Sequence, residues 1–352
     1  MEASQAADSF EKQTTNTNFE IVDPNELPET WDAHPFSISL NSFLKGMDDF
    51  RDAVNLSLPA VLKSRNEEMA KQLKELEKYV KVEEEGTKKV VAKGAHAASH
   101  MLNTVDSVKR ISEAKVTKVI ERSLFVGLFS EYDVFIGNLM KAIYCRKPEL
   151  FRGIKREISL PELLNFDDLD AVKADMLSKE IDAFRRESYI EQFAILEKKF
   201  DITLTKFPEW ATFVEISQRR NLMTHNDGIV SEQYLNVCKK EGFKFEKMPA
   251  VGDDLKLGGP YFSSSIAILS KVAFMLTHTL WRKILPRESE LAHSFMNKNI
   301  YDLLKRKRWI LASEFGMFSL SAGSSAKISE IDHRMRVINT AIVNRPGFTR
   351  HF

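Results

Sequence analysis

Five polar residues that lie close together in the sequence have side chains suited to phosphate chemistry. They are Arg220, Asn221, Thr224, His225 and Asn226. An arginine presents a planar fork of donors to phosphate oxygens, and a histidine can act as general acid or base near neutral pH. Together these two side chains could cleave a phosphodiester, while the asparagines and the threonine would add hydrogen bonds to the substrate.

These residues lie at the end of a predicted helix that covers residues 208–228, with Asp227 and Gly228 as its stop. At about 100° per residue, the apolar side of this helix continues toward its C-terminus into the polar set. The residues of that apolar side are Trp210, Phe213 and Val214. Glu215 and Arg219 are predicted to face solvent. An inward face that turns polar departs from the pattern of a core helix, and such departures are expected where function lies.

A structural interpretation of the same pattern stays open. The helix end could simply emerge into solvent, with Arg220 extending its charge to the surface and His225 capping backbone carbonyls.

Three residues from other segments are candidates to join the site. Asp133 lies at the edge of an apolar stripe, where it would either orient an arginine or histidine or remain a surface carboxylate. Lys271 and His278 lie on a nearly continuous apolar helix predicted at 262–285. They would form either part of a groove for RNA or a solvent-facing edge.

Composition excludes several classes of protein. The 352 residues carry a formal net charge of +1, which argues against a nucleic-acid binder that relies on bulk charge. Two cysteines exclude a disulfide scaffold and indicate a reducing, cytoplasmic location. His96 and His100 have the spacing of a helical metal site but lack a third ligand nearby, so no metal is expected. No cofactor motif is present, and charged residues within 263–281 argue against a membrane span.

Helical periodicity predicts an all-α protein, because strand signals are weak throughout. The predicted parts are a disordered tail at 1–35, an N-terminal helical extension at 36–112, a helical bundle at 113–286 and a C-terminal helical hairpin at 287–352. An exposed helix is predicted at 64–89, and the hairpin is predicted to consist of helices at 298–314 and 327–344. The strongest helix, at 113–144, carries one apolar stripe. Its members are Phe125, Leu128, Phe129, Tyr132, Phe135, Ile136, Leu139, Met140 and Ile143.

The segment from Arg220 to His225 resembles the Arg-x4–6-His signature of HEPN domains, in the form in which asparagine follows the arginine. Residues 130–135 resemble the first long HEPN helix, which commonly carries an acidic residue beside an aromatic one. Residues 299–343 resemble the helical tail of some members. The resemblance covers roughly residues 113–345 and predicts an HEPN-like helical bundle.

The resemblance implies a metal-independent endoribonuclease that works as a homodimer with a composite active site. Arg220 and His225 would then be catalytic, with Asn221 and Asp133 orienting groups at the site. Thr224, Asn226, Lys271 and His278 would contact RNA. The family context implies a toxin or antiviral-defence effector, with the N-terminal extension available to a regulatory partner. The alternative is a non-catalytic HEPN-like module for dimerisation, partner binding or regulatory RNA binding.

Overall fold

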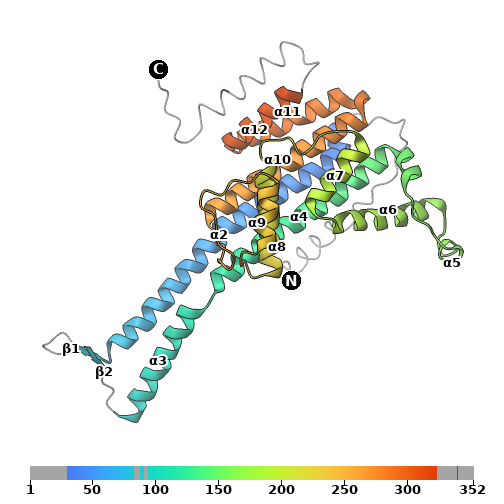
Figure 1. Ribbon diagram of the computed structural model, residues 1–352. Coiled ribbons are helices and arrows are strands. Elements are labelled where there is room, and N and C mark those ends of the chain that lie inside the picture. Colours follow the sequence, from blue (N-terminus) through green and yellow to red (C-terminus); the bar gives the residue numbers. More distant parts are fainter. Residues whose placement is uncertain (1–29, 83–87, 91–93, 323–338, 340–352) are drawn as a thin grey trace, which may run out of the picture.

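The computed structural model describes residues 30–82, 88–90, 94–322 and 339, and within these ranges the chain is almost entirely helical (Figure 1). The helices are η1 Trp31–Ala33, α2 Pro35–Glu77, α3 Ala95–Glu113, α4 Val116–Arg146, η2 Pro148–Gly153, α5 Leu160–Leu163, α6 Leu169–Arg186, α7 Tyr189–Phe200, α8 Trp210–His225, α9 Glu232–Lys240, α10 Gly259–Ile284, η3 Pro286–Glu288, α11 Ser289–Lys305 and α12 Trp309–Ala322. Two short strands, β1 Val80–Val82 and β2 Lys88–Val90, pair antiparallel. The predicted all-α class is confirmed.

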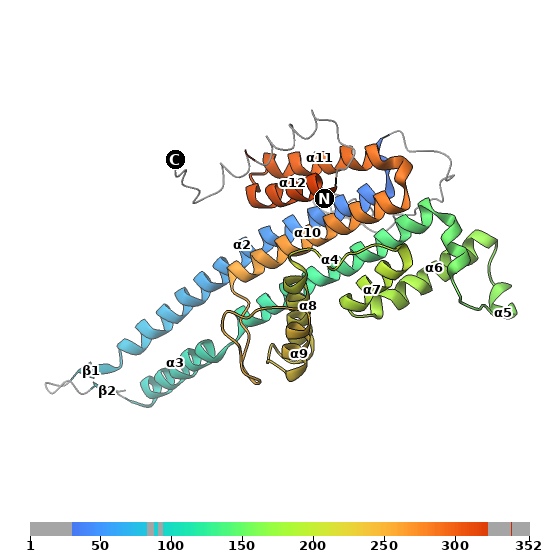
Figure 2. The ribbon, with the colours of Figure 1, turned by 45° about the horizontal axis from the view of Figure 1, so that its top comes forward.

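The core lies where three long helices, α2, α4 and α10, run side by side (Figures 1 and 2). Every member of the apolar stripe predicted on α4 is buried. Helix α10 is buried on most of its circumference, as its nearly continuous apolar sequence predicts. Burial of each large apolar side chain contributes about 1.5–3 kcal/mol, so these three helices form the main stabilising unit.

The first half of α2 belongs to this core and is not part of a separate extension. Phe36, Leu40, Phe43 and Met47 are buried in the same cluster as the α4 stripe. The predicted boundary at residue 112 therefore does not coincide with a break in packing. Residues 36–112 were predicted to be an extension because the resemblance to HEPN domains begins at about residue 113.

The later part of α2 and helix α3 form a helical arm, residues 60–77 and 95–113, which projects from the bundle and carries the two strands near its tip (Figures 1 and 2). In α3 only Thr104 is buried. Arg65 joins the two helices of the arm by donating from Nη2 to the carbonyl oxygen of Ile111 at 2.6 Å. The exposed helix predicted at 64–89 is present but ends at Glu77, and the strands follow it.

The C-terminal hairpin consists of α11 and α12, so the prediction of one helix at 298–314 is wrong. The chain turns at Lys307, whose φ of 57° lies in the left-handed region. The amide of Lys307 donates to the carbonyl of Leu304 at 3.0 Å, and the amide of Arg308 donates to that of Leu303 at 2.8 Å. These two hydrogen bonds cap the C-terminus of α11, and the left-handed position that Lys307 occupies is usually a glycine. The second predicted helix, 327–344, lies outside the described residues apart from residue 339, as does the predicted tail up to residue 29. The prediction of disorder up to residue 35 is wrong for residues 31–35, because η1 and the start of α2 lie there and His34 is buried.

A buried charged cluster joins the start of α2 to the ends of α4 and α10. Glu288 Oε2 lies 2.9 Å from His34 Nε2 and accepts from Trp281 Nε1 at 2.9 Å, and its Oε1 accepts from Arg146 Nη2 at 2.6 Å. His34 stacks on Trp281 with ring centroids 4.0 Å apart. Burial alone would raise the pKa of Glu288, but the hydrogen bonds from these three side chains outweigh it and lower the pKa to about 2. The carboxylate is therefore ionised in the folded protein at neutral pH.

Candidate active site at the end of helix α8

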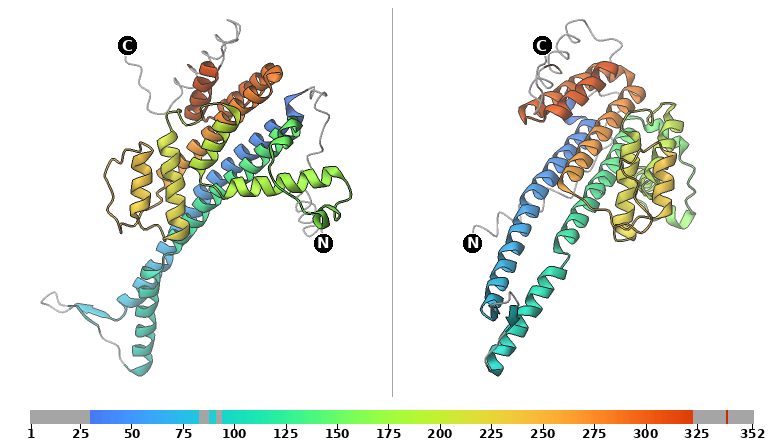
Figure 3. Two further views of the ribbon diagram at one scale, coloured as in Figure 1. Left: turned by 45° about the vertical axis from the view of Figure 1, so that its right-hand side comes forward. Right: turned by 60° about the vertical axis from the view of Figure 1, so that its left-hand side comes forward.

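Helix α8 carries the sequence-predicted site and lies with α9 on one flank of the long helices (Figures 1 and 3). It ends at His225, and the amides of Asn226 and Gly228 both donate to the carbonyl of Leu222, at 2.8 and 3.0 Å. Asp227 and Gly228 adopt positive φ angles of 50° and 83°. The stop predicted at these two residues is confirmed, because a left-handed backbone ends a helix.

The structure brings Asp133 of α4 and Arg220 of α8 together. Arg220 Nη2 lies 3.5 Å from Asp133 Oδ2, and Arg220 Nη1 donates to Asn221 Oδ1 at 3.1 Å. The guanidinium also lies 5.9 Å from the ring centroid of Phe129. Its Nε is buried and has no hydrogen-bond partner among the described residues. This ion pair is the arrangement in which Asp133 orients an arginine.

Asp133 is itself held in place by a second side chain. Tyr189 of α7 donates its hydroxyl to Asp133 Oδ1 at 2.8 Å. Burial raises the pKa of Asp133, although the Tyr189 hydrogen bond and the charges of Arg220 and Arg185 act in the opposite direction. The carboxylate is thus fixed from two sides, and the orientation of Arg220 follows from the packing of α4, α7 and α8.

His225 lies on the surface at the last residue of α8, with Thr224 and Asn226 exposed beside it. Thr224 donates its hydroxyl back to the carbonyl of Arg220 at 2.9 Å, and Asn226 donates its side-chain amide to the carbonyl of Ile229 at 2.7 Å. No hydrogen bond joins the His225 ring to any residue in the described part of the chain. Its imidazole is therefore open to a ligand, and it is not used to cap the helix within these ranges.

Two residues predicted to face solvent instead belong to a network that sequence reasoning missed, in which Glu215 is buried and Arg219 is half-buried. Glu215 is 1% exposed and accepts from the hydroxyls of Tyr234 at 2.6 Å and Tyr261 at 2.7 Å. Arg219 donates from Nε to Glu215 Oε1 at 2.8 Å and lies over the ring of Tyr261, 3.9 Å from its centroid. The prediction was wrong because α8 is covered on two sides, by α9 and by α10. The network fixes α8 against both.

Two of the predicted RNA contacts are wrong. Lys271 is buried to 9% exposure and forms an ion pair with Glu209. His278 is fully buried between aromatic rings, with Phe274 4.5 Å and Trp281 6.4 Å away between centroids. Burial lowers the pKa of His278 to about 3, so its ring is neutral at physiological pH. His278 packs against Phe295 of α11, with ring centroids 5.6 Å apart, whereas Lys271 points toward the start of α8, where Glu209 lies.

Two cations that were not predicted lie at the end of α8. Lys118 Nζ lies 3.0 Å from Asp254 Oδ1, and Arg122 Nη1 lies 2.6 Å from Asp227 Oδ1. Both come from the first turns of α4, so they attach the loop after His225 to that helix. The only sequence signal was the basic residues of 115–122, which resemble an ordinary solvated helix end.

These features define an all-α protein in which a helix end presents an ion-paired arginine and an exposed histidine. Comparison with protein-family models, curated proteins and solved structures finds no match to the chain. Within the described ranges, every helix is too short or too polar to cross a membrane. In the same ranges no three His, Cys, Asp or Glu side chains gather in a group that could hold a metal ion.

Proposed function

We propose that the protein is a metal-independent endoribonuclease of the HEPN type that acts as a homodimer. The observation that carries the proposal is the placement of Arg220 and His225. Asp133 holds the guanidinium of Arg220 at 3.5 Å, and His225 is exposed on the same helix end. Measurement of the RNA cleavage rate of the His225→Ala variant tests this proposal.

The proposed reaction is attack by the 2′-hydroxyl of RNA on the adjacent phosphorus. The 2′-oxygen loses its proton as the O–P bond forms, and the leaving 5′-oxygen gains a proton as the P–O bond breaks. His225 serves in these proton transfers, and Arg220 binds the phosphate oxygens whose negative charge grows in the transition state. Asn221 and the exposed Thr224 and Asn226 supply hydrogen bonds to the substrate.

The two proton transfers require two groups, and one chain offers one His225 at this site. A twofold dimer that brings the two α8 ends together would supply a histidine for each step, with an arginine beside each. We expect a homodimer at micromolar concentration, measured by sedimentation velocity under the conditions of the cleavage assay. A fully active monomer would contradict the composite site.

Cleavage should be independent of added metal. Two-metal nucleases hold their ions with carboxylates, whereas the polar set at this helix end consists of Arg220, Asn221, Thr224, His225 and Asn226. We expect an RNA oligonucleotide to be cut in excess EDTA, with 2′,3′-cyclic phosphate and 5′-hydroxyl ends. A matched oligonucleotide with one 2′-deoxy residue at the cut position should resist cleavage there. A magnesium requirement, or cleavage of DNA at a similar rate, would rule the proposed mechanism out.

A non-catalytic module is a second candidate, and one observation favours it. Asp133 and Asn221 already provide partners for the charge of Arg220 in the single chain, so the ion pair also makes sense as part of a binding surface. In that case the protein would bind RNA or a partner without cutting RNA. Two results together would support this function. The purified parent protein would dimerise and bind RNA or a partner without cleaving RNA, and the Arg220→Ala variant would lose that binding.

The cellular role that we propose is a cytoplasmic toxin or antiviral-defence effector. Such a nuclease has to be restrained until it is needed, and the helical arm is the part of the fold that projects from the bundle. It exposes large apolar side chains, including Leu62, Leu73 and Leu102. We place the contact with a regulatory partner there.

A further inference from the structure

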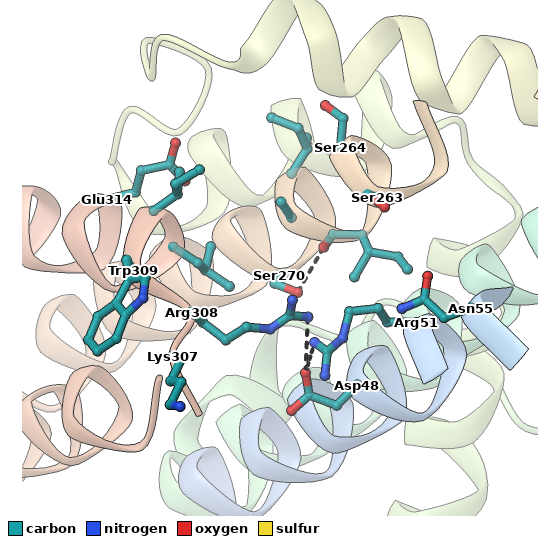
Figure 4. Close-up of a pocket in the computed structure, with 15 residues that line it drawn as sticks. Asp48, Arg51, Asn55, Ser263, Ser264, Ser270, Lys307, Arg308, Trp309 and Glu314 are labelled. Carbon is teal, nitrogen blue, oxygen red and sulfur yellow. Dashed lines mark hydrogen bonds and ion pairs between the residues drawn. The ribbon is translucent and has the colours of Figure 1, made fainter. Parts of the chain in front are cut away.

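A cavity lies away from Asp133 and Arg220, between α2, the first half of α10 and the turn that joins α11 to α12 (Figure 4). Its volume is about 570 Å³, within the range of about 300–1,000 Å³ that small-molecule sites occupy. None of the candidate catalytic residues lines it. A ligand bound here would therefore act separately from the site on α8.

One end of the cavity carries more arginines than its carboxylate can satisfy. Asp48 forms ion pairs with Arg51 and Arg306, and its Oδ1 lies 3.6 Å from Arg308 Nη2. Figure 4 shows Arg51 and Arg308 converging on Asp48 from opposite elements. Arg51 Nε also lies 3.5 Å from Asp52 Oδ1. Each guanidinium has five N–H donors, so the carboxylates of Asp48 and Asp52 leave several donors of these three groups available to a further anion.

The turn after α11 places Lys307 and Arg308 at the mouth of the cavity. Lys307 occupies a left-handed position that costs a non-glycine residue about 1–2 kcal/mol. The next residue but one, Trp309, begins α12, and the first helical bond there runs from the amide of Ala312 to the carbonyl of Arg308. The amides before Ala312 are thus free of intrahelical bonds and lie at the positive end of the helix dipole. Charge and dipole both favour a phosphate.

The rest of the cavity wall is mainly apolar and includes a flat ring, although Asn55, Ser270 and the carboxylate of Glu314 also line it. Trp309 is half-buried and lines the cavity together with Ile266, Ala267, Ile268 and Leu311. Ser263 and Ser264 add exposed hydroxyls from α10. An inorganic ion would use the arginines and leave this wall without a partner. A ligand that joins a phosphate to a planar ring would use both ends, because an indole can stack on such a ring.

From this arrangement we infer that the cavity is a binding site for a nucleotide. Its phosphate contacts Arg51 and Arg308 near the start of α12, its base lies along Trp309 and the apolar wall, and its sugar lies near the serine hydroxyls. Arginine forks suit phosphate oxygens because they donate two parallel hydrogen bonds.

Isothermal titration calorimetry on the full chain tests this site with AMP, and with adenosine and inorganic phosphate as its two halves. We expect AMP to bind at least about 10-fold more tightly than either half, since only AMP uses both ends of the cavity. No binding of AMP up to millimolar concentration would overturn the proposal. Equal binding of phosphate would show a site for anions only, and equal binding of adenosine would show that the cations play no part.

Substitutions in the cavity test whether AMP binds there, and the measurement is separate from RNA cleavage. Arg308→Gln should weaken AMP binding by about 10-fold or more, the scale of a charge-assisted hydrogen bond, and Trp309→Leu should weaken AMP but not phosphate. Lys305→Gln is the matched control, because it removes a charge from the basic segment 305–308 at an exposed residue that does not line the cavity. An equal loss in Lys305→Gln would show that the binding depends on bulk charge and would refute the site. The readout is binding, so it does not depend on nuclease activity.

Discussion

Replacing His225 with alanine should lower the rate of RNA cleavage by about 100-fold or more, the usual scale for loss of a general acid or base. The variant should stay folded, with a free energy of unfolding within about 1 kcal/mol of the parent, because the side chain is exposed at a helix end. The measurements are initial cleavage rates on one RNA oligonucleotide and urea denaturation of the same preparation. Lost activity together with unfolding would point instead to a structural role for this histidine.

The matched control is His96→Ala, since His96 is an exposed histidine on the helical arm. It should cleave at the parent rate. Arg220→Ala should lose at least as much activity as His225→Ala, because the guanidinium is the group proposed to meet the phosphate. Asp133→Asn should lose less activity, since Tyr189 can still hydrogen-bond to the side chain at position 133 and Asn221 still accepts a hydrogen bond from Arg220. If Asp133→Asn were the most damaging of the three, Asp133 and not His225 would be the acid or base.

Two patterns that depend on a single helix were predicted correctly. The stripe on α4 could be predicted because burial along one helix face follows the 3.6-residue period. The end of α8 could be predicted because Asp227 and Gly228 tolerate a left-handed backbone. The contact of Asp133 with Arg220 was one of two alternatives, since the stripe placed Asp133 at its edge without showing which helix would cover it.

Features that depend on a second helix could not be predicted. Glu215 and Arg219 have the spacing of an ordinary surface pair, and only the packing of Tyr234 and Tyr261 shows that Glu215 is buried and Arg219 half-buried. His278 appeared to belong to a basic stripe, because the sequence does not reveal that α11 and α12 cover that side. The turn at Lys307 has no glycine or proline to mark it, so the hairpin was placed too late in the chain.

Replacing Glu288 with glutamine should lower the free energy of unfolding by about 3 kcal/mol at pH 7. This value follows from the pKa of Glu288, which falls from an ordinary value of 4.5 to about 2 in the folded protein, at about 1.4 kcal/mol for each unit. The physical cause is that Arg146 would keep its buried charge after losing its carboxylate partner, a costly arrangement. Urea denaturation measures the difference. Glu290→Gln is the control, because Glu290 is exposed two residues further along the chain.

The pH dependence of this difference identifies the carboxylate as its source. The folded pKa of Glu288 lies below the unfolded one, so its contribution is present in full above about pH 5 and is lost as the pH falls toward 2. The parent and Glu288→Gln should therefore converge in acid, while Glu290→Gln should follow the parent throughout. The parent also loses stability in acid through His278, whose pKa of about 3 in the folded protein favours protonation of the unfolded chain. That loss is common to all three proteins, because each retains His278, and it cancels in the difference. A gap between the parent and Glu288→Gln that stays constant from pH 7 to pH 3 would show that the glutamine disturbs packing, and that the charge of Glu288 does not stabilise the fold.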